Sequence, residues 1–172
     1  TNFKSKEEWE TFAAPLRQKF LVASGLWPLP EKTPLNAKVE PVATHPDYIV
    51  EKVSFEAFPG FLVTGNLYRP VGDGPYPGVI CPHGHWEHGR FENTDLCSVS
   101  GRCITFARMG MAAFCYDMVG YNDSKQFPRG WGHSGGNVSE EQRRLEGLWG
   151  IHPFAMQLWS AVRALDFMET LP

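Results

Sequence analysis

The sequence lacks a long apolar run, a strong charge imbalance and any internal repeat. No uninterrupted apolar segment approaches the roughly 18 residues that a membrane-spanning helix needs. The formal net charge is only −3, which gives no electrostatic reason to expect a nucleic acid or an acidic membrane as a partner. We therefore expect neither. With 42% hydrophobic and 20% charged residues, the 172-residue chain is expected to fold as a globular protein with one core.

Paired cysteine motifs are also missing. The four cysteines match neither a C-x-x-C redox pair nor a paired zinc framework. Cys81 and Cys115 fall inside apolar runs, where a buried, reduced thiol behaves as a small hydrophobe. Cys97 and Cys103 lie six residues apart on an expected helix, too far for easy bridging. No cofactor is expected, and the absence of a signal-peptide pattern leaves the compartment open.

The first 40 residues predict a helix followed by a proline-rich connector. Ser5 and Glu8 have the spacing of a capping box at the start of a helix. The apolar residues behind them recur at helical spacing and form one stripe: Trp9, Phe12, Leu16 and Phe20. Three prolines between residues 28 and 34 then enforce an irregular connector. We assign residues 1–40 to this segment and residues 41–172 to one α/β domain.

The second segment opens with a hairpin. Tyr48 to Phe58 alternates apolar and charged residues, and Phe61 to Tyr68 is its expected partner strand across the turn Pro59-Gly60.

Two further strands and two helices are expected. The short apolar runs Gly78 to Cys81 and Met111 to Tyr116 predict buried strands, with a helix over Asn93 to Met109 between them. A strand–helix–strand unit of this kind forms a parallel pair. A long polar loop over residues 120–150 precedes a last helix that begins at Pro153.

The most informative segment follows the first of these buried strands. Residues 81–90 read Cys-Pro-His-Gly-His-Trp-Glu-His-Gly-Arg, after a hairpin that ends Asn-Leu-Tyr-Arg-Pro at residues 66–70. The later strand leads into Asp-Met-Val-Gly-Tyr-Asn-Asp-Ser at residues 117–124. In these motifs and their order, residues 41–172 resemble the N-terminal portion of α/β-hydrolases, in particular the branch that contains acetyl xylan esterases and related carbohydrate esterases. The resemblance implies an incomplete α/β-hydrolase fold, a mainly parallel sheet with an antiparallel N-terminal hairpin, seen here as its first four strands.

The same resemblance implies a site at the turn after the third of those strands. In that family the His-Gly-x turn supplies half of the oxyanion hole, so the backbone N–H of His85 is the expected donor, with Gly84 and Trp86 beside it. A fixed N–H aimed at the developing oxyanion contributes several kcal/mol to ester hydrolysis. A glycine next to the donor lets the substrate approach the backbone closely.

The implied activity is serine-type hydrolysis of a carboxylic ester through an acyl-enzyme, with an acetylated carbohydrate or another small ester as substrate. The nucleophile, its acid and its histidine are expected downstream of Pro172, so this chain alone is expected to be inactive. The remainder of the same domain is its expected partner. A periplasmic or secreted location would follow from a carbohydrate substrate, and a non-catalytic binding remnant stays an alternative.

A rival interpretation uses the same segment. His83, His85, Glu87 and His88 have the spacing of the H-x-H-x-D-H zinc motif of metallo-β-lactamase-like hydrolases, with glutamate in place of aspartate. No run of several strands precedes the motif, and the sequence after it favours the other fold. We therefore expect no bound metal.

Two features of the long loop bear on function. Ser134 lies in a literal G-x-S-x-G, but Pro128 and Gly130 break the strand that a nucleophile elbow needs before it. We therefore interpret Ser134 as a loop serine. Tyr121 and Trp131 are candidate substrate-binding residues that could stack on a sugar ring, although aromatic residues are more often packing residues.

Overall fold

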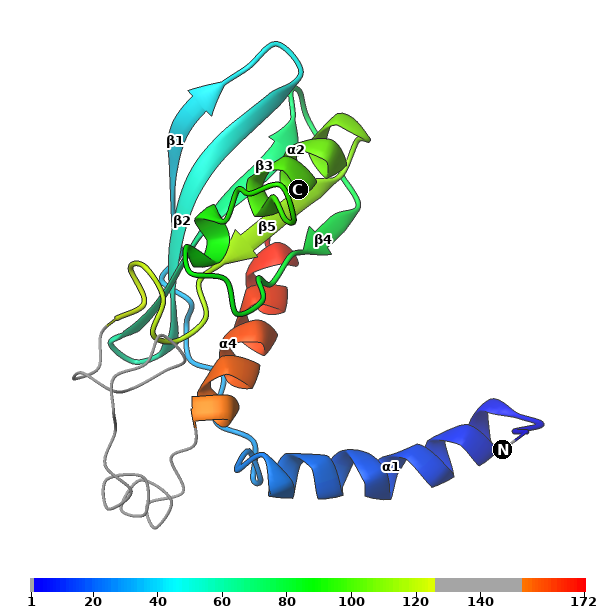
Figure 1. Cartoon of the computed structure of the whole chain (residues 1–172). Helices are drawn as coiled ribbons and strands as arrows, with labels where there is room; N and C mark the ends of the chain where they lie inside the picture. The colour runs from blue at the N-terminus through cyan, green and yellow to red at the C-terminus, as the bar shows by residue number, and fades with distance from the viewer. Residues whose placement is uncertain (1, 126–152) are drawn as a thin grey trace.

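The computed structural model describes residues 2–125 and 153–172, and these form a sheet with a helix on each face and a further helix at the N-terminus (Figure 1). The elements in chain order are α1 (Lys6–Ala23), β1 (Lys38–Thr44), β2 (Tyr48–Phe58), β3 (Phe61–Pro70), β4 (Gly78–Ile80), the 3-10 helix η1 (Gly89–Phe91), α2 (Val99–Arg108), β5 (Ala112–Tyr116) and α4 (Pro153–Met168). None of the described helices is both long enough and apolar enough to cross a membrane.

The five strands form one sheet in the order β1-β2-β3-β5-β4. The hairpin β2–β3 and the parallel pair β4–β5, joined by α2, are confirmed. The α/β class is confirmed as well, but over the described residues the sheet is mostly antiparallel and not mainly parallel, because β3 also pairs antiparallel with β5. A parallel neighbour needs a crossover connection, and α2 is the one crossover between strands of this part of the chain.

Strand β1 was not expected, so the sheet has five strands here and not four. It begins at Lys38, inside the segment assigned to the connector, and pairs antiparallel with β2. Pro41 argues against a strand at this position in the sequence, because proline cannot donate a hydrogen bond to a neighbouring strand and is tolerated only at a sheet edge or at a bulge. β1 satisfies both conditions, because it is the outermost strand and its register shifts between Pro41 and Ala43.

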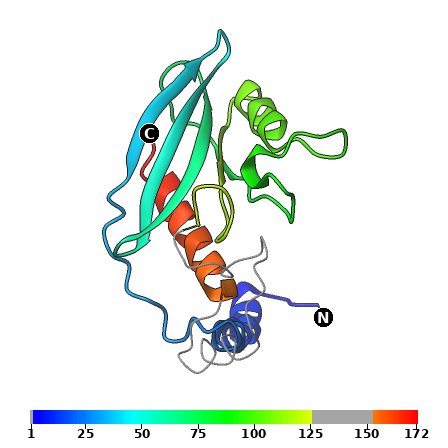
Figure 2. The same cartoon turned by 60° about the vertical axis from the view of Figure 1, so that its left-hand side comes forward.

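Each face of the sheet packs against a hydrophobic core, because side chains along β5 point alternately into one core and the other. Phe114 and Tyr116 join the core on the α4 side, with Phe167 of α4 stacked over Phe55 of β2. Ala113 and Cys115 belong to the core under α2. Successive side chains of a strand point to opposite faces, so a fully buried strand requires a cover on each side. Figure 2 shows α2 and α4 on either side of β5.

The cysteines behave as expected in the core. Cys81, Cys103 and Cys115 are buried and all four cysteines are free thiols. The prediction that Cys97 lies on the same helix as Cys103 is wrong, because α2 begins at Val99 and not at Asn93. The Ser98 hydroxyl caps that helix by accepting the N–H of Gly101 at 3.0 Å.

Helix α1 has the expected cap but an exposed apolar stripe. The Ser5 hydroxyl accepts the N–H of Glu8 at 3.2 Å. The stripe residues are between 43% and 53% exposed, and the helix extends away from the sheet (Figure 1): Trp9, Phe12, Leu16 and Phe20. Only Ala13 of this helix is buried. The described part of the chain covers the stripe only in part, through contacts of Phe3 with Trp9 and Phe12 and of Phe154 with Phe20.

Candidate functional site

The candidate site lies where the two parallel strands end. Ile80 of β4 pairs with Phe114 of β5, and the N–H of Cys81 continues the ladder to the Phe114 carbonyl at 2.8 Å. The turn of residues 82–88 therefore leaves the sheet beside residues 117–124, which follow β5. Carboxyl ends of parallel strands are where open α/β sheets bind their ligands.

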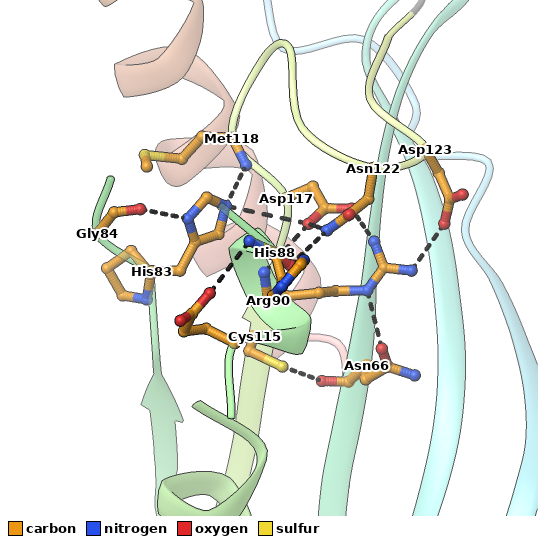
Figure 3. Close-up of polar contacts among 12 residues, drawn as sticks. Asn66, His83, Gly84, His88, Arg90, Cys115, Asp117, Met118, Asn122 and Asp123 are labelled. Carbon is orange, nitrogen blue, oxygen red and sulfur yellow. Dashed lines mark hydrogen bonds and ion pairs between the residues drawn. The ribbon is translucent and has the colours of Figure 1, made fainter. Parts of the chain in front are cut away.

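His83 links the turn of residues 82–88 to the segment of residues 117–124 through buried hydrogen bonds. Its buried ring accepts the N–H of Met118 on Nε2 at 3.2 Å, and its Nδ1 lies 2.7 Å from the carbonyl of Gly84 (Figure 3). Because Nε2 accepts, the proton of the neutral ring lies on Nδ1 and is donated to Gly84. Burial lowers the pKa of His83, and the hydrogen bond to Gly84 opposes that effect. His83 is thus a neutral crosslink.

Arg90 is the second buried crosslink. Its Nε donates to Oδ1 of Asn66 on β3 at 2.9 Å, and one Nη donates to Oδ2 of Asp123 at 2.7 Å. Its other Nη donates to Oδ2 of Asp117, the fully buried residue that directly follows β5. Breaking a buried ion pair of this kind by removing one partner costs about 3–5 kcal/mol. Arg90 therefore joins η1, β3 and the segment after β5 (Figure 3).

The second oxygen of Asp117 completes the network. Its Oδ1 accepts Nδ2 of Asn122 at 2.7 Å, and the same amide group donates to the carbonyl of His88 at 3.1 Å. Gly89 lies against this contact with φ of +55°, and a Cβ there would be 2.9 Å from Nδ2 of Asn122. The tight approach explains the glycine after His88.

The three residues expected to form the oxyanion turn lie at the surface above this network. His85 and Trp86 are exposed and Gly84 is half-buried. The Trp86 ring lies over Gly84, because a Cβ on Gly84 would be 3.0 Å from Nε1 of the indole. The turn therefore has an exposed rim and a base that His83 fixes. The role of these residues in catalysis stays a prediction.

The remaining residues considered in the sequence lie away from the surface of the turn or outside the described residues. Tyr121 is buried and sets its ring edge against His83, with centroids 4.6 Å apart, so it packs beneath the turn. Its contact with a substrate remains a prediction. Trp131 and Ser134 lie outside the described residues.

The geometry does not favour the zinc interpretation. His83 is buried with both ring nitrogens engaged in hydrogen bonds, whereas His85 and His88 are exposed. A metal on His83 would break one of these hydrogen bonds. Within residues 2–125 and 153–172, no group of three or more histidine, cysteine or acidic side chains is arranged to hold a metal ion.

Sequence reasoning found the two segments but not the pair that joins them. Arg90 and Asp117 both lie in the quoted motifs, yet neither was assigned a role. The available signal was Asp117, a charged residue directly after an apolar run. A charged residue at such a position is rarely buried unless it has a partner of opposite charge. The sequence does not say which partner it meets.

Comparisons with known proteins support the same fold. No protein-family model matches the chain, and no curated protein matches it. Among solved structures it is similar to the methylesterase BT1017, with 29% identity and a TM-score of 0.55 over 71% of this chain and 27% of that one. It is also similar to an acetyl xylan esterase from Paenibacillus sp. R4, with 19% identity and a TM-score of 0.55 over 97% of this chain and 48% of that one.

A third similar structure is a candidate acetyl xylan esterase from Bacteroides fragilis, with 17% identity and a TM-score of 0.67 over 96% of this chain and 45% of that one. The chain spans less than half the length of each of these proteins. It therefore has an esterase-like fold over the part that it covers.

Proposed function

We propose that the chain is the N-terminal part of a serine-type carboxylic ester hydrolase that removes acetyl groups from a carbohydrate. The observation that carries this proposal is the Gly84-His85-Trp86 turn, fixed at the carboxyl end of a parallel strand pair in a fold shared with acetyl xylan esterases. Its substrate is an acetylated carbohydrate or another small ester. Its partner is the remainder of the same domain.

Rigidity at the base of the turn supports this role. A donor stabilises an oxyanion only if it already points at the place where the charge develops, because reorientation during the reaction removes the benefit. The hydrogen bonds of His83 and the Arg90–Asp117 pair hold both sides of the turn through buried contacts. These contacts support a fixed position for the backbone N–H of residue 85.

The chemistry assigned to the turn is stabilisation of the tetrahedral intermediate. A serine hydroxyl supplied by the downstream portion attacks the ester carbonyl, and its proton passes to a histidine of that portion. The carbonyl oxygen becomes an oxyanion that accepts the N–H of His85. The histidine returns that proton to the sugar oxygen as the bond between this oxygen and the acyl carbon breaks, which leaves an acyl-enzyme. Water then hydrolyses the acyl-enzyme to acetate and the free serine.

A backbone donor can be tested with a proline substitution. His85→Pro removes the N–H, and His85→Ala keeps it while removing the imidazole. In folded protein that contains residues 1–172 and the downstream portion, we expect His85→Pro to lower kcat for acetate release by about 10²–10³-fold. His85→Ala should stay within about tenfold of the unmodified enzyme.

The thermal midpoint of each variant is measured alongside, because a proline can also disturb the turn itself. Equal kcat for the two variants, at matching thermal midpoints, would contradict the assignment of the donor. A large loss in His85→Ala would instead make the imidazole the functional group.

A further inference from the structure

We propose that the polar face of β1, β2 and β3 beside Arg90 binds a sugar chain that carries a carboxylate, that is, a uronate-bearing oligosaccharide. The inference rests on the proposed function, because it places a second contact for the same carbohydrate. The face borders a cavity of about 330 Å³ between the three strands and the segments that hold Arg90 and Asp123. Figure 3 shows Asp123 and Asn66 on either side of the Arg90 guanidinium, next to these strands.

Strand register builds the face as two polar rows. Lys38 of β1 lies opposite Ser54 of β2, and Ser54 lies opposite Thr64 of β3. Residues directly opposite each other in a sheet point to the same face, so these three side chains form one row. The row crosses two strand spacings, or about 10 Å. Ammonium and hydroxyl groups along it offer the donors and acceptors that sugar hydroxyls and carboxylates need.

The second row is formed in the same way by Glu40, Lys52 and Asn66. The Lys52 ammonium lies 2.6 Å from a Glu40 oxygen, and Asn66 accepts the Nε–H of Arg90. This row therefore links the strands to the network under the turn after β4.

Charge pairing singles out Lys38. Both carboxylates that line the cavity have cationic partners, Glu40 with Lys52 and Asp123 with Arg90. Asp117, which is buried, is the second carboxylate paired with that guanidinium. The Lys38 ammonium makes no hydrogen bond or ion pair with another residue of the described chain, although its charge acts on Glu40 through space. It is the cation left for a ligand carboxylate.

The position of the face fits a chain that extends from the site of chemistry. β3 runs antiparallel to β5, with Gly65 opposite Tyr116, so this end of β3 lies next to the carboxyl end of β5. The N–H of Asp117 donates to the carbonyl of Thr64 at 2.9 Å. One oligosaccharide could therefore place one sugar unit at the turn after β4 and a second sugar unit on the two polar rows.

Titration calorimetry tests the inference on folded protein that contains residues 1–172. The probes are a glucuronate-substituted xylo-oligosaccharide and the same backbone without the acid. We expect the acidic probe to bind about two- to tenfold more tightly, since an exposed charge pair contributes a modest free energy. Lys38→Ala should remove that difference, whereas Lys19→Ala on α1 should leave it intact. High salt should reduce it.

Equal affinity for the two probes, no binding of either, or a difference that survives Lys38→Ala would overturn the proposal. Thermal midpoints show that Lys38→Ala is folded, which is expected for an exposed edge position. Binding is measured without turnover. Lys38-dependent binding in a protein without esterase activity would therefore reject the proposed function and retain the binding face.

Discussion

At the scale of single residues, two buried polar side chains hold the candidate site from below. His83 joins the turn after β4 to Met118, and Arg90 joins η1 to β3 and to Asp117. Sequence motifs located both segments because Pro, His, Gly and Asp recur there in a recognisable order. They could not tell that His83 points inward while His85 points outward, because that difference depends on contacts with residues more than 30 positions away.

The buried state of His83 predicts a dependence of stability on pH. Burial lowers its pKa in the folded protein below the ordinary value of 6.5. The unfolded chain therefore binds the proton more readily, and stability is lost as the pH falls from 6.5 toward the folded pKa. Chemical denaturation between about pH 7.5 and pH 5 measures this loss. Replacing His83 by Gln, which keeps a donor and an acceptor, should flatten the profile over that window.

His88→Gln is the matched control, since His88 belongs to the same turn but is exposed. Its pH profile should follow that of the unmodified protein. A His83→Gln profile with the same slope as the unmodified protein would show that His83 is not the group responsible.

At the scale of elements, the sequence predicted the strands with clear alternation or continuous apolar runs. The hairpin β2–β3, the pair β4–β5 and the start of α4 at Pro153 lie where they were expected. β1 escaped because of Pro41, and the start of α2 was placed too early because a helical pattern was extended past the cap at Ser98. The strand order could not be predicted from local sequence patterns. β3 is followed in the chain by β4, but it pairs with β5, which comes after the α2 crossover.

The meeting of β3 and β5 depends on a glycine. A Cβ at Gly65 would lie 2.5 Å from the carbonyl oxygen of Cys115 and 2.6 Å from the ring of Phe114. Backbone cannot move aside as a side-chain tip can, so Gly65→Ala should lower the free energy of unfolding by about 1–3 kcal/mol. Urea denaturation measures the change.

Gly78→Ala on β4 is the appropriate comparison. A Cβ there would meet only the terminal methyl of Met168 at 3.1 Å, which can rotate away. Its loss of stability should be clearly smaller. A Gly65→Ala protein as stable as Gly78→Ala would mean that β3 and β5 are not packed as closely as described.

At the scale of the whole molecule, one strand edge and one apolar surface of the described chain are not fully covered by it. β4 pairs with β5 on one side only, so its other side is the edge of the described sheet. The apolar stripe of α1 is exposed as well. Exposed strand edges and apolar faces favour association with further chain. We propose that the downstream portion supplies a strand beside β4 that carries the nucleophile. The division into residues 1–40 and residues 41–172 stays a prediction, and β1 runs across its boundary.

The most direct test of the central claim is to locate the reactive serine. Residues 1–172, alone and together with the downstream portion, are treated with a serine-reactive organophosphonate, and the labelled peptide is identified by mass spectrometry. The account predicts no label and no acetate release from residues 1–172 alone, and a label downstream of Pro172 in the active protein that Ser134→Ala leaves unchanged. A label on Ser134, lost together with acetate release in Ser134→Ala, would contradict it.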